Sequence, residues 1–555
     1  MSRHIKIYCV NTAEYLSIDG GDTLTDILNR VRGQLSFTPI CARVNNRTEA
    51  LSFQVFMPKQ VEFLPPGHPS SRRVYTRSLC FMLYKAVSEV CPGMALRMEH
   101  SVSRGYYCRL HPLSSPQDTV TPDVAEIKRA MQRLCERNLP IQRHERLTKD
   151  VMEIFRAQHL HSKVQLLETT HELYTTYYTL DSLADSYYGP LAPSTGALKV
   201  FDLQPYAEGM LLLPPGHDMG EAAVPVEQKK MLAAFTDYQR FNHVVGVSNV
   251  GELNEAIAQK RSDMLINLAE TLHSNVLSHI AARIARSGAR VVLLAGPSSS
   301  GKTTTCKRLS IHLMANLLKP KMISLDDYFV DRHTTPRDPA TGDYDYESLY
   351  ALDLPLLNRH LNALLAGERI NLPTYSFELG ARVERERPLR LEKDDVLLIE
   401  GIHGLNPGLT PDVPRDKVFK VYVSALTTLA IDDHNWIPTT DTRLLRRLVR
   451  DHKYRNTSAL DTLKRWASVR RGEENWIFPF QENADATFNS SLLFEPAVLK
   501  EYAEPLLKSV PHDCEQYSEA SRLLRFLSYF SPLRPDQIPS TSLLREFLGG
   551  SSFRY

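Results

Sequence analysis

The sequence predicts an α/β protein whose second half contains a doubly wound parallel sheet and whose first half contains two smaller α+β domains. The glycine-rich stretch 296–303 follows an apolar run at 291–294 and precedes a helix-forming stretch. Further apolar runs at 396–399 and 418–425 fit buried strands. Alternation of strand, helix and strand over such a length is typical of a parallel sheet.

The composition excludes several classes of protein. Hydrophobic residues make up 43% of the 555 residues, and the net charge of +2 provides no global attraction for a nucleic acid. Any RNA contact must therefore come from a local patch. The eight cysteines are scattered, the first residues lack a secretory signal, and no apolar run approaches the ~18 residues of a membrane span. We expect a cytoplasmic protein without membrane contact.

Two Pro-Pro-Gly breaks, at 65–67 and 214–216, are expected to end domains because they cannot continue a helix or a central strand. Amphipathic patterns before Gly288 predict a helical connector, for which a dimer-forming coil is the alternative. A homo-oligomer is expected. The expected divisions are 1–66, 67–220, 221–288, 289–500 and a C-terminal helical extension at 501–555.

The first segment contains strand patterns in IKIYCV, ICARVN and LSFQVFMP and a helical pattern in TLTDILNRV. This size and order resemble the ubiquitin-like TGS domains of threonyl-tRNA synthetases and some GTPases.

The second segment contains, in order, YTRSLCFMLYKAVSEV, RHERLTKDVMEIFRAQ and YYGPLAPSTGALKVFDL. This order resembles the second additional, or editing, domain of threonyl-tRNA synthetases, in which HxxxH and CxxxH motifs supply four metal ligands. The matching positions here hold Arg77, Phe81, Tyr187 and Leu191. We therefore expect no metal and no editing hydrolysis here, and interpret the domain as a scaffold or a binding domain.

The stretch GPSSSGKT at 296–303 predicts a phosphate-binding loop, because its glycines let backbone amides turn toward an anion at the start of a helix. Lys302 is expected to reach the β- and γ-phosphates, and the hydroxyl of Thr303 to bind Mg²⁺. The alternative is a Ser/Gly turn with an exposed lysine. The expected nucleotide contacts are Gly296, Pro297, Ser298, Ser299, Ser300, Gly301, Lys302, Thr303 and Thr304.

Two acidic residues end apolar strands of the predicted sheet, where ligands bind in open α/β folds. Asp326 follows KMISL and is placed to accept the proton of a hydroxyl that attacks a γ-phosphoryl group. A helix N-cap or a group that orients Mg²⁺ is the alternative. Glu400 ends LLIE and is expected to hold Mg²⁺ through water, with a structural cap as the alternative.

Four arginines share one face of the helix predicted by DTRLLRRLVRD, at spacings of three and four. Such a face suits a lid that stabilises charge on the transferring group and excludes water. A solvated amphipathic helix is the alternative. The four residues are Arg443, Arg446, Arg447 and Arg450.

The motifs GPSSSGKTT, ISLDDYF, GDYDYES, LLAGERINLPTYSF, LLIEGIHGLNP and DTRLLRRLVRD, taken together, resemble those of the uridine kinase and phosphoribulokinase family of P-loop kinases. The resemblance implies Asp326 as the base, Asp345 and Tyr375 as nucleoside contacts, and Arg443 and Arg446 as lid residues. It implies ATP or GTP as phosphate donor with Mg²⁺, and the 5′-hydroxyl of uridine or cytidine as acceptor.

Two positions depart from the uridine-cytidine kinase pattern. Gly380 stands where those kinases carry a base-reading histidine, and Thr457 stands where they carry an arginine. The sequence therefore predicts a nucleoside kinase whose base preference is open. The alternatives are a nucleotide-dependent RNA-binding or regulatory protein and a kinase for another small metabolite.

Overall fold

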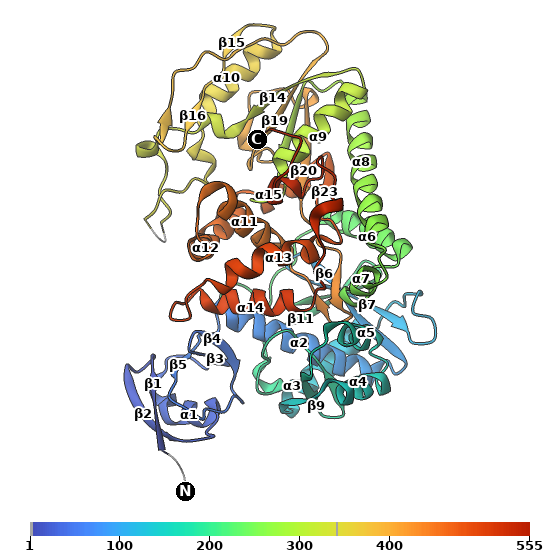
Figure 1. The fold of residues 1–555 in the computed structure, drawn as a ribbon, viewed down its shortest axis with the longest axis vertical. Coiled ribbons are helices and arrows are strands. Elements are labelled where there is room, and N and C mark those ends of the chain that lie inside the picture. The colour runs from blue at the N-terminus through green and yellow to red at the C-terminus, as the bar shows by residue number, and fades with distance from the viewer. Residues whose placement is uncertain (1–3, 340–341, 555) are drawn as a thin grey trace.

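The computed structural model describes residues 4–339 and 342–554. The first domain is a five-stranded mixed sheet, in the order β2-β1-β5-β3-β4, with one helix packed on it. It lies at the lower left of Figure 1. Its elements are β1 (His4–Cys9), β2 (Glu14–Asp19), α1 (Leu24–Val31), β3 (Cys41–Val44), β4 (Arg47–Ala50) and β5 (Gln60–Phe63). Helix α1 begins with a capping box between Thr23 and Asp26.

The second domain contains two antiparallel sheets, in the orders β11-β12-β7-β6 and β10-β9-β8. Most of α2 is buried, and its apolar side chains join strands and helices of the domain in one core. The helices are α2 (Pro69–Val90), α3 (Val124–Arg137), α4 (Thr148–Ala157) and α5 (His161–Thr170). The strands are β6 (Met94–Val102), β7 (Gly105–Pro112), β8 (Ile141–Leu147), β9 (Tyr174–Leu180), β10 (Leu183–Asp185), β11 (Asp202–Tyr206) and β12 (Gly209–Leu213).

Three helices connect the second domain to the sheet that carries the phosphate loop. They are α6 (Lys229–Val245), α7 (Val250–Ala258) and α8 (Ser262–Ser287). Helix α8 ends at Gly288, whose φ of 70° is the left-handed conformation expected of a helix stop. The connector runs along the right side of the molecule in Figure 1, and α8 packs on α9.

The third domain is a parallel sheet in the order β14-β19-β13-β20-β23, which confirms the predicted fold class. All five residues of β13 are buried, as expected for a central strand that is covered on both faces. The strands are β13 (Val291–Ala295), β14 (Lys319–Ser324), β19 (Asp395–Glu400), β20 (Val418–Ser424) and β23 (Ala486–Asn489).

The helices of the third domain cover the sheet and continue beyond it. They are α9 (Lys302–Ala315), α10 (Leu354–Leu365), α11 (Thr439–Arg455), α12 (Ala459–Trp476), α13 (Glu495–Lys508), α14 (Tyr517–Ser528) and α15 (Arg545–Leu548). The short paired strands are β15 (Ile370–Asn371) with β18 (Pro388–Leu389), β16 (Tyr375–Ser376) with β17 (Ala381–Arg382), and β21 (Ala430–Asp432) with β22 (Asn435–Trp436). No helix in the described ranges is both long enough and apolar enough to span a bilayer.

Buried charges join the second and third domains. The ammonium group of Lys163 lies 2.8 Å from a carboxylate oxygen of Asp185 and 2.8 Å from one of Asp432, and all three side chains are buried. His434 bonds the other oxygen of Asp185 at 2.8 Å. Because breaking such a cluster would leave uncompensated buried charge, it opposes separation of the two domains.

Candidate active site

The loop between β13 and α9 has the geometry of an anion-binding site. A Cβ atom at Gly296 would lie 1.9 Å from the backbone oxygen of Val423 on β20, so only glycine fits there. Gly301 has φ +81° and Ser299 has φ 58°. Left-handed residues in such a loop turn successive amides toward one side. The loop opens at the N-terminus of α9, where the helix dipole attracts an anion.

Lys302 begins α9, and its ammonium group lies 3.1 Å from the carbonyl oxygen of Pro297. Burial lowers the pKa of Lys302, and four nearby carboxylates oppose that shift. The carboxylates belong to Glu400, Asp326, Glu347 and Glu546. The lysine is therefore the positive centre of a group of carboxylates, two of which lie at the carboxyl ends of β14 and β19.

The hydroxyl of Thr303 lies 3.1 Å from both carboxylate oxygens of Glu400. Burial raises the pKa of Glu400 to about 7, and the charges of Asp326 and Glu546 add to the shift while Lys302 opposes it. Among the described residues, no group of three or more His, Cys, Asp and Glu side chains is arranged to hold a metal alone. The oxygen donors present fit Mg²⁺, which takes few protein ligands and completes its shell with phosphate and water.

Asp326 lies in the short 3₁₀ helix Leu325–Tyr328 that follows β14. Its carboxylate accepts no hydrogen bond from any described residue, and Ser324 rather than Asp326 provides the cap of this helix. Asp326 is exposed to solvent, but the surrounding protein limits the hydration of its carboxylate and so raises its pKa. The positive charges of Lys302 and Arg455 oppose this rise in pKa. Such a carboxylate is suited to accept a proton.

An aromatic cluster lies beside this acid. The ring of Phe329 lies 5.6 Å from that of Tyr375 and 5.5 Å from that of Phe377. The Tyr375 hydroxyl is buried and has no partner among the described residues. Asp345 accepts a hydrogen bond from the backbone of Glu347 at 3.1 Å, and burial raises its pKa.

The position of the missing histidine is filled by another residue. A Cβ atom at Gly380 would lie 2.5 Å from Nε of Arg332. That guanidinium donates to the Tyr346 hydroxyl at 3.3 Å and to the backbone oxygen of Phe377 at 2.8 Å. Arg332 thus stands at the edge of the aromatic cluster, and its role could not be read from the sequence because it is 48 residues from Gly380.

The structure corrects the lid interpretation of Arg443. This residue is 1% exposed and forms ion pairs with both oxygens of Glu473, one of them at 2.8 Å. It also donates to the backbone oxygen of Ser298 at 3.0 Å. A side chain held in this way is not free to fold over a nucleotide. It fixes the backbone of the phosphate loop instead.

Arg446 requires the same correction. It is fully buried and pairs with both oxygens of Glu495, one at 2.7 Å. It donates to the backbone oxygen of Ser299 at 3.3 Å and to that of Ser490 at 2.8 Å. Arg446 is therefore held in place by these bonds and supports the backbone of the phosphate loop.

Two cations further along α11 lie close enough to the carboxylates around Lys302 to affect their pKa values. Arg447 is half-buried and donates to the Ser298 hydroxyl at 2.8 Å. Arg455, which is close enough to affect the pKa of Asp326, lies 3.4 Å from Asp451. Helical spacing placed Arg447 on one face with Arg443 and Arg446, but it did not show that those two arginines are buried while Arg447 is partly exposed. A lid role for Arg447 stays a prediction.

Glu546 is a functional candidate that the sequence did not reveal. Its carboxylate accepts hydrogen bonds from the backbone amide of Thr304 at 3.2 Å and from its hydroxyl at 2.5 Å. A Cβ atom at Gly301 would lie 2.7 Å from Cδ1 of Leu543, three residues before Glu546, so this segment packs against the loop. A carboxylate at this helix N-terminus occupies a place that also suits a phosphate. The C-terminal segment that carries Glu546 therefore borders the phosphate loop (Figure 1).

We expect Glu546→Gln to tighten binding of a nucleoside triphosphate by about tenfold, because a carboxylate beside the loop repels phosphates and competes for the Thr304 amide. The measurement is titration with a fluorescent ATP analogue. Glu501→Gln, at an exposed position on α13, is the matched control and should leave affinity unchanged. Weaker binding by Glu546→Gln would mean that the carboxylate supports the loop rather than competing with the nucleotide.

The stability of the protein should depend on pH through two acidic residues. The pKa values of Glu347 and Glu400 are each raised to about 7, mainly by burial. Between the unfolded pKa of about 4.5 and the folded pKa, the folded state binds more protons, so stability from these groups is lost as pH rises. We expect the melting temperature in EDTA to fall from about pH 5 to about pH 8. Glu400→Gln should flatten this dependence, and an unchanged slope would contradict it.

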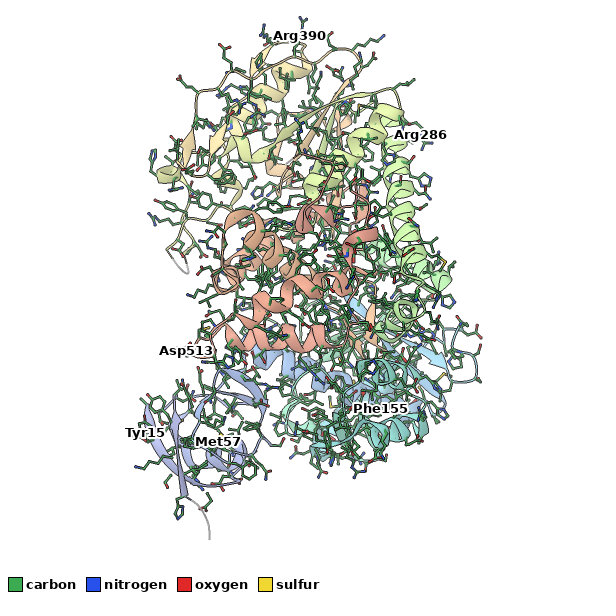
Figure 2. The ribbon with its side chains drawn as sticks, in the orientation of Figure 1. Tyr15, Met57, Phe155, Arg286, Arg390 and Asp513 are labelled. Atoms are coloured by element: carbon green, nitrogen blue, oxygen red, sulfur yellow. The ribbon has the colours of Figure 1, made fainter. Side chains whose placement is uncertain are left out.

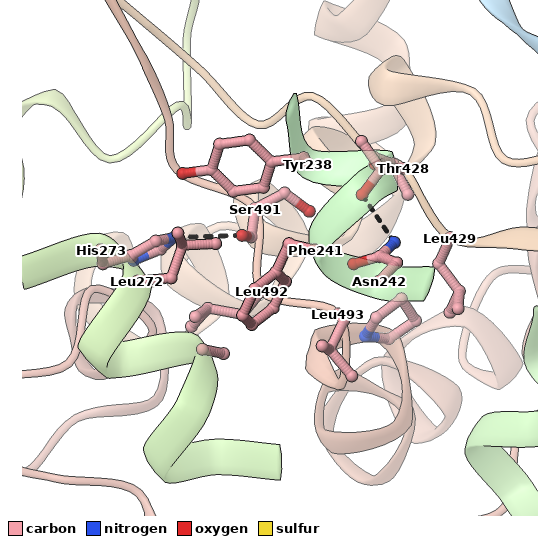
Figure 3. A pocket seen from close by; sticks show the side chains of 13 residues that line it. Tyr238, Phe241, Asn242, Leu272, His273, Thr428, Leu429, Ser491, Leu492 and Leu493 are labelled. Atoms are coloured by element: carbon pink, nitrogen blue, oxygen red, sulfur yellow. Dashed lines mark hydrogen bonds between the residues drawn. The ribbon is translucent and has the colours of Figure 1, made fainter. Parts of the chain in front are cut away.

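Small cavities elsewhere in the described residues do not compete for the role of active site. Figure 3 shows one between α6, α8 and the loop after β23, where His273 bonds the backbone of Ser491 at 3.1 Å and Asn242 bonds Thr428 at 3.0 Å. Its volume of about 10 Å³ has room for one water at most. This cavity is a gap in packing.

Comparisons with known proteins relate the third domain to kinases. The model of the Phosphoribulokinase / Uridine kinase family matches residues 291–492. A uridine kinase of Lactobacillus helveticus is 30% identical over 200 residues, which cover 35% of this chain and 83% of that enzyme. A uridine kinase of Halobacterium salinarum is 29% identical over 195 residues, 35% of this chain and 76% of its own length.

The N-terminal part matches a threonine–tRNA ligase of Rubrobacter xylanophilus, with 26% identity over 192 residues. The match covers 35% of this chain but only 29% of that ligase. A solved structure described as a possible uridine kinase from Bacillus stearothermophilus covers 39% of this chain and 97% of its own, with 21% identity and a TM-score of 0.27.

The phosphate loop, the parallel sheet and these relatives define a phosphotransferase with an alcohol acceptor. The chain belongs to the phosphoribulokinase and uridine kinase family.

Proposed function

We propose that this protein is a nucleoside kinase that transfers the γ-phosphoryl group of ATP or GTP to the 5′-hydroxyl of uridine, cytidine or a related nucleoside. The observation that supports this most directly is the unpaired carboxylate of Asp326 beside Lys302. A base and a phosphate-binding lysine in one pocket are what in-line transfer to an alcohol requires.

In the proposed reaction, the substrate oxygen attacks the γ-phosphorus as its proton moves to a carboxylate oxygen of Asp326. The bond from the γ-phosphorus to the bridging oxygen breaks, and its electron pair leaves with the nucleoside diphosphate. Lys302 binds the β- and γ-phosphates, and Arg447 and Arg455 reduce the repulsion between charges. Thr303 and Glu400 would hold Mg²⁺, which neutralises charge on the phosphates when bound.

The aromatic cluster of Phe329, Tyr375 and Phe377 supports a planar base as part of the substrate, because stacked or edge-on rings favour such a partner. The unpartnered hydroxyl of Tyr375 offers a donor to that base. Asp345 is the proposed contact for the ribose hydroxyls.

A second candidate is a kinase for another small alcohol that carries a negative group. The observation in its favour is Arg332, whose guanidinium fills the space at Gly380 where a base-reading side chain is expected. Arginine binds carboxylate and phosphate through paired donors.

The test is release of ADP from ATP and Mg²⁺ with a panel of nucleosides, sugar phosphates, hydroxy acids and tRNA. Stimulation by uridine or cytidine supports the first candidate. Stimulation confined to an anionic alcohol supports the second, and stimulation by tRNA alone would replace both with an RNA-dependent activity.

A further inference from the structure

A second cleft lies where three parts of the chain meet, away from the nucleotide site. It is lined by strand β4 of the first domain, by helix α2 and strands β8 and β9 of the second, and by helix α14. Helix α14 contacts β4, and Arg73 of α2 forms an ion pair with Glu519 of α14 at 2.9 Å (Figure 1). The cleft has a volume of about 320 Å³, which lies within the range of small-molecule sites.

Six arginines line this cleft. Five of them have a carboxylate within 3.3 Å. These five are Arg47, Arg73, Arg143, Arg522 and Arg525. The three glutamates of the lining are all used in these pairs. The positive charge of the sixth arginine, Arg77, is therefore not neutralised by the lining.

Arg77 lies on α2 and is 6% exposed. Within the described part of the chain no carboxylate forms an ion pair with it, and its Nε has no hydrogen-bond partner. Nη2 donates to the backbone oxygen of Pro190 at 3.2 Å, and the guanidinium lies 5.6 Å from the ring centre of Tyr188. Burial lowers its pKa to about 10, and the positive charges of Arg73 and Arg522 contribute to that shift.

A buried guanidinium without a counter-ion is costly, because neither water nor a carboxylate replaces its hydration. Since the other five arginines of the cleft are paired with carboxylates, the charge of Arg77 is the one left uncompensated among the lining residues, and it favours an anion. Arginine binds phosphate through two parallel N–H donors, and its planar guanidinium matches the geometry of a phosphate group.

We propose that this cleft binds a small phosphate monoester, with Arg77 as its anchor. The phosphate group pairs with the free donors of Arg77, and the rest of the ligand lies against Tyr178 and Tyr188. The site is independent of the proposed kinase reaction, because it shares no residue with the phosphate loop.

The test uses the full chain with Lys302→Met, so that phosphates bind poorly at the nucleotide loop. Ribose 5-phosphate and inorganic phosphate are titrated by calorimetry at constant ionic strength. We expect one ribose 5-phosphate per chain, and Arg77→Met should weaken it at least about tenfold. Arg286→Met, at the exposed position on α8 labelled in Figure 2, is the matched control and should not change affinity. Absence of binding, or equal affinity with Arg77→Met, would overturn the proposal.

Thermal unfolding separates this role from a structural one. If Arg77 binds a ligand, Arg77→Met should not lower the melting temperature of the free protein, because the substitution removes an uncompensated charge. Ribose 5-phosphate should raise the melting temperature of the protein with Arg77, and Arg77→Met should abolish that rise. A lower melting temperature with the rise retained would show a structural role and contradict the proposal. Arg143→Gln, at an exposed rim position, should reduce the rise without affecting folding. An undiminished rise would count against the site.

Discussion

Replacing Asp326 with asparagine is expected to lower turnover by about 10² to 10⁴ while nucleotide binding persists. Asparagine keeps the size and polarity of the side chain but cannot take a proton from an alcohol. The phosphate loop is unaffected, because the Asp326 carboxylate forms no hydrogen bond with any described residue. Single-turnover kinetics with the best substrate of the panel measure the chemical step, and a fluorescent nucleotide measures binding.

The matched control is Asp513→Asn, on the exposed loop labelled in Figure 2, which should leave turnover unchanged. Normal turnover with Asp326→Asn would remove Asp326 from the mechanism. A loss of nucleotide affinity equal to the loss of turnover would assign it to binding instead.

Arg446→Met is expected to destabilise the third domain by about 3–5 kcal/mol. Its partner Glu495 is fully buried, and among the described residues Arg446 is the one cation within ion-pair distance of it. Methionine fills similar space but leaves that carboxylate uncompensated. Urea unfolding followed by tryptophan fluorescence measures the effect on this domain, because Trp436, Trp466 and Trp476 all lie in the second half of the chain.

The double variant Arg446→Met with Glu495→Leu should recover most of the lost stability, because removing both charges removes the desolvation cost. If the double variant is as unstable as the single one, the contribution of Arg446 lies in its bonds to the Ser299 and Ser490 backbone rather than in the ion pair.

The phosphate loop and the parallel sheet could be predicted because their signals are local. Glycine spacing, a preceding apolar run and a following helix occupy fewer than about thirty consecutive residues, as usual for such a motif. The position of Asp326 followed from one rule, that ligands gather at the carboxyl ends of parallel strands.

The surroundings of the arginines could not be predicted from spacing. Periodicity shows which residues share a helical face, but not whether that face meets solvent or other parts of the chain. Glu473 and Glu495 lie 30 and 49 residues beyond the arginines they pair with. Arg77 presented the same difficulty. The sequence shows that an arginine stands where the related domains carry a metal ligand. It does not show that Arg77 lacks a carboxylate partner, because that depends on how three separate segments of the chain pack around it.

The contact between Thr304 and Glu546 joins residues 242 positions apart. A ribosome adds roughly 5–20 residues per second, so roughly 10–50 s pass between synthesis of these two residues. During that interval the nascent chain already carries the loop but lacks the acidic residue that bonds to it. Until the last residues of the chain are made, the amide and hydroxyl of Thr304 therefore lack this acceptor.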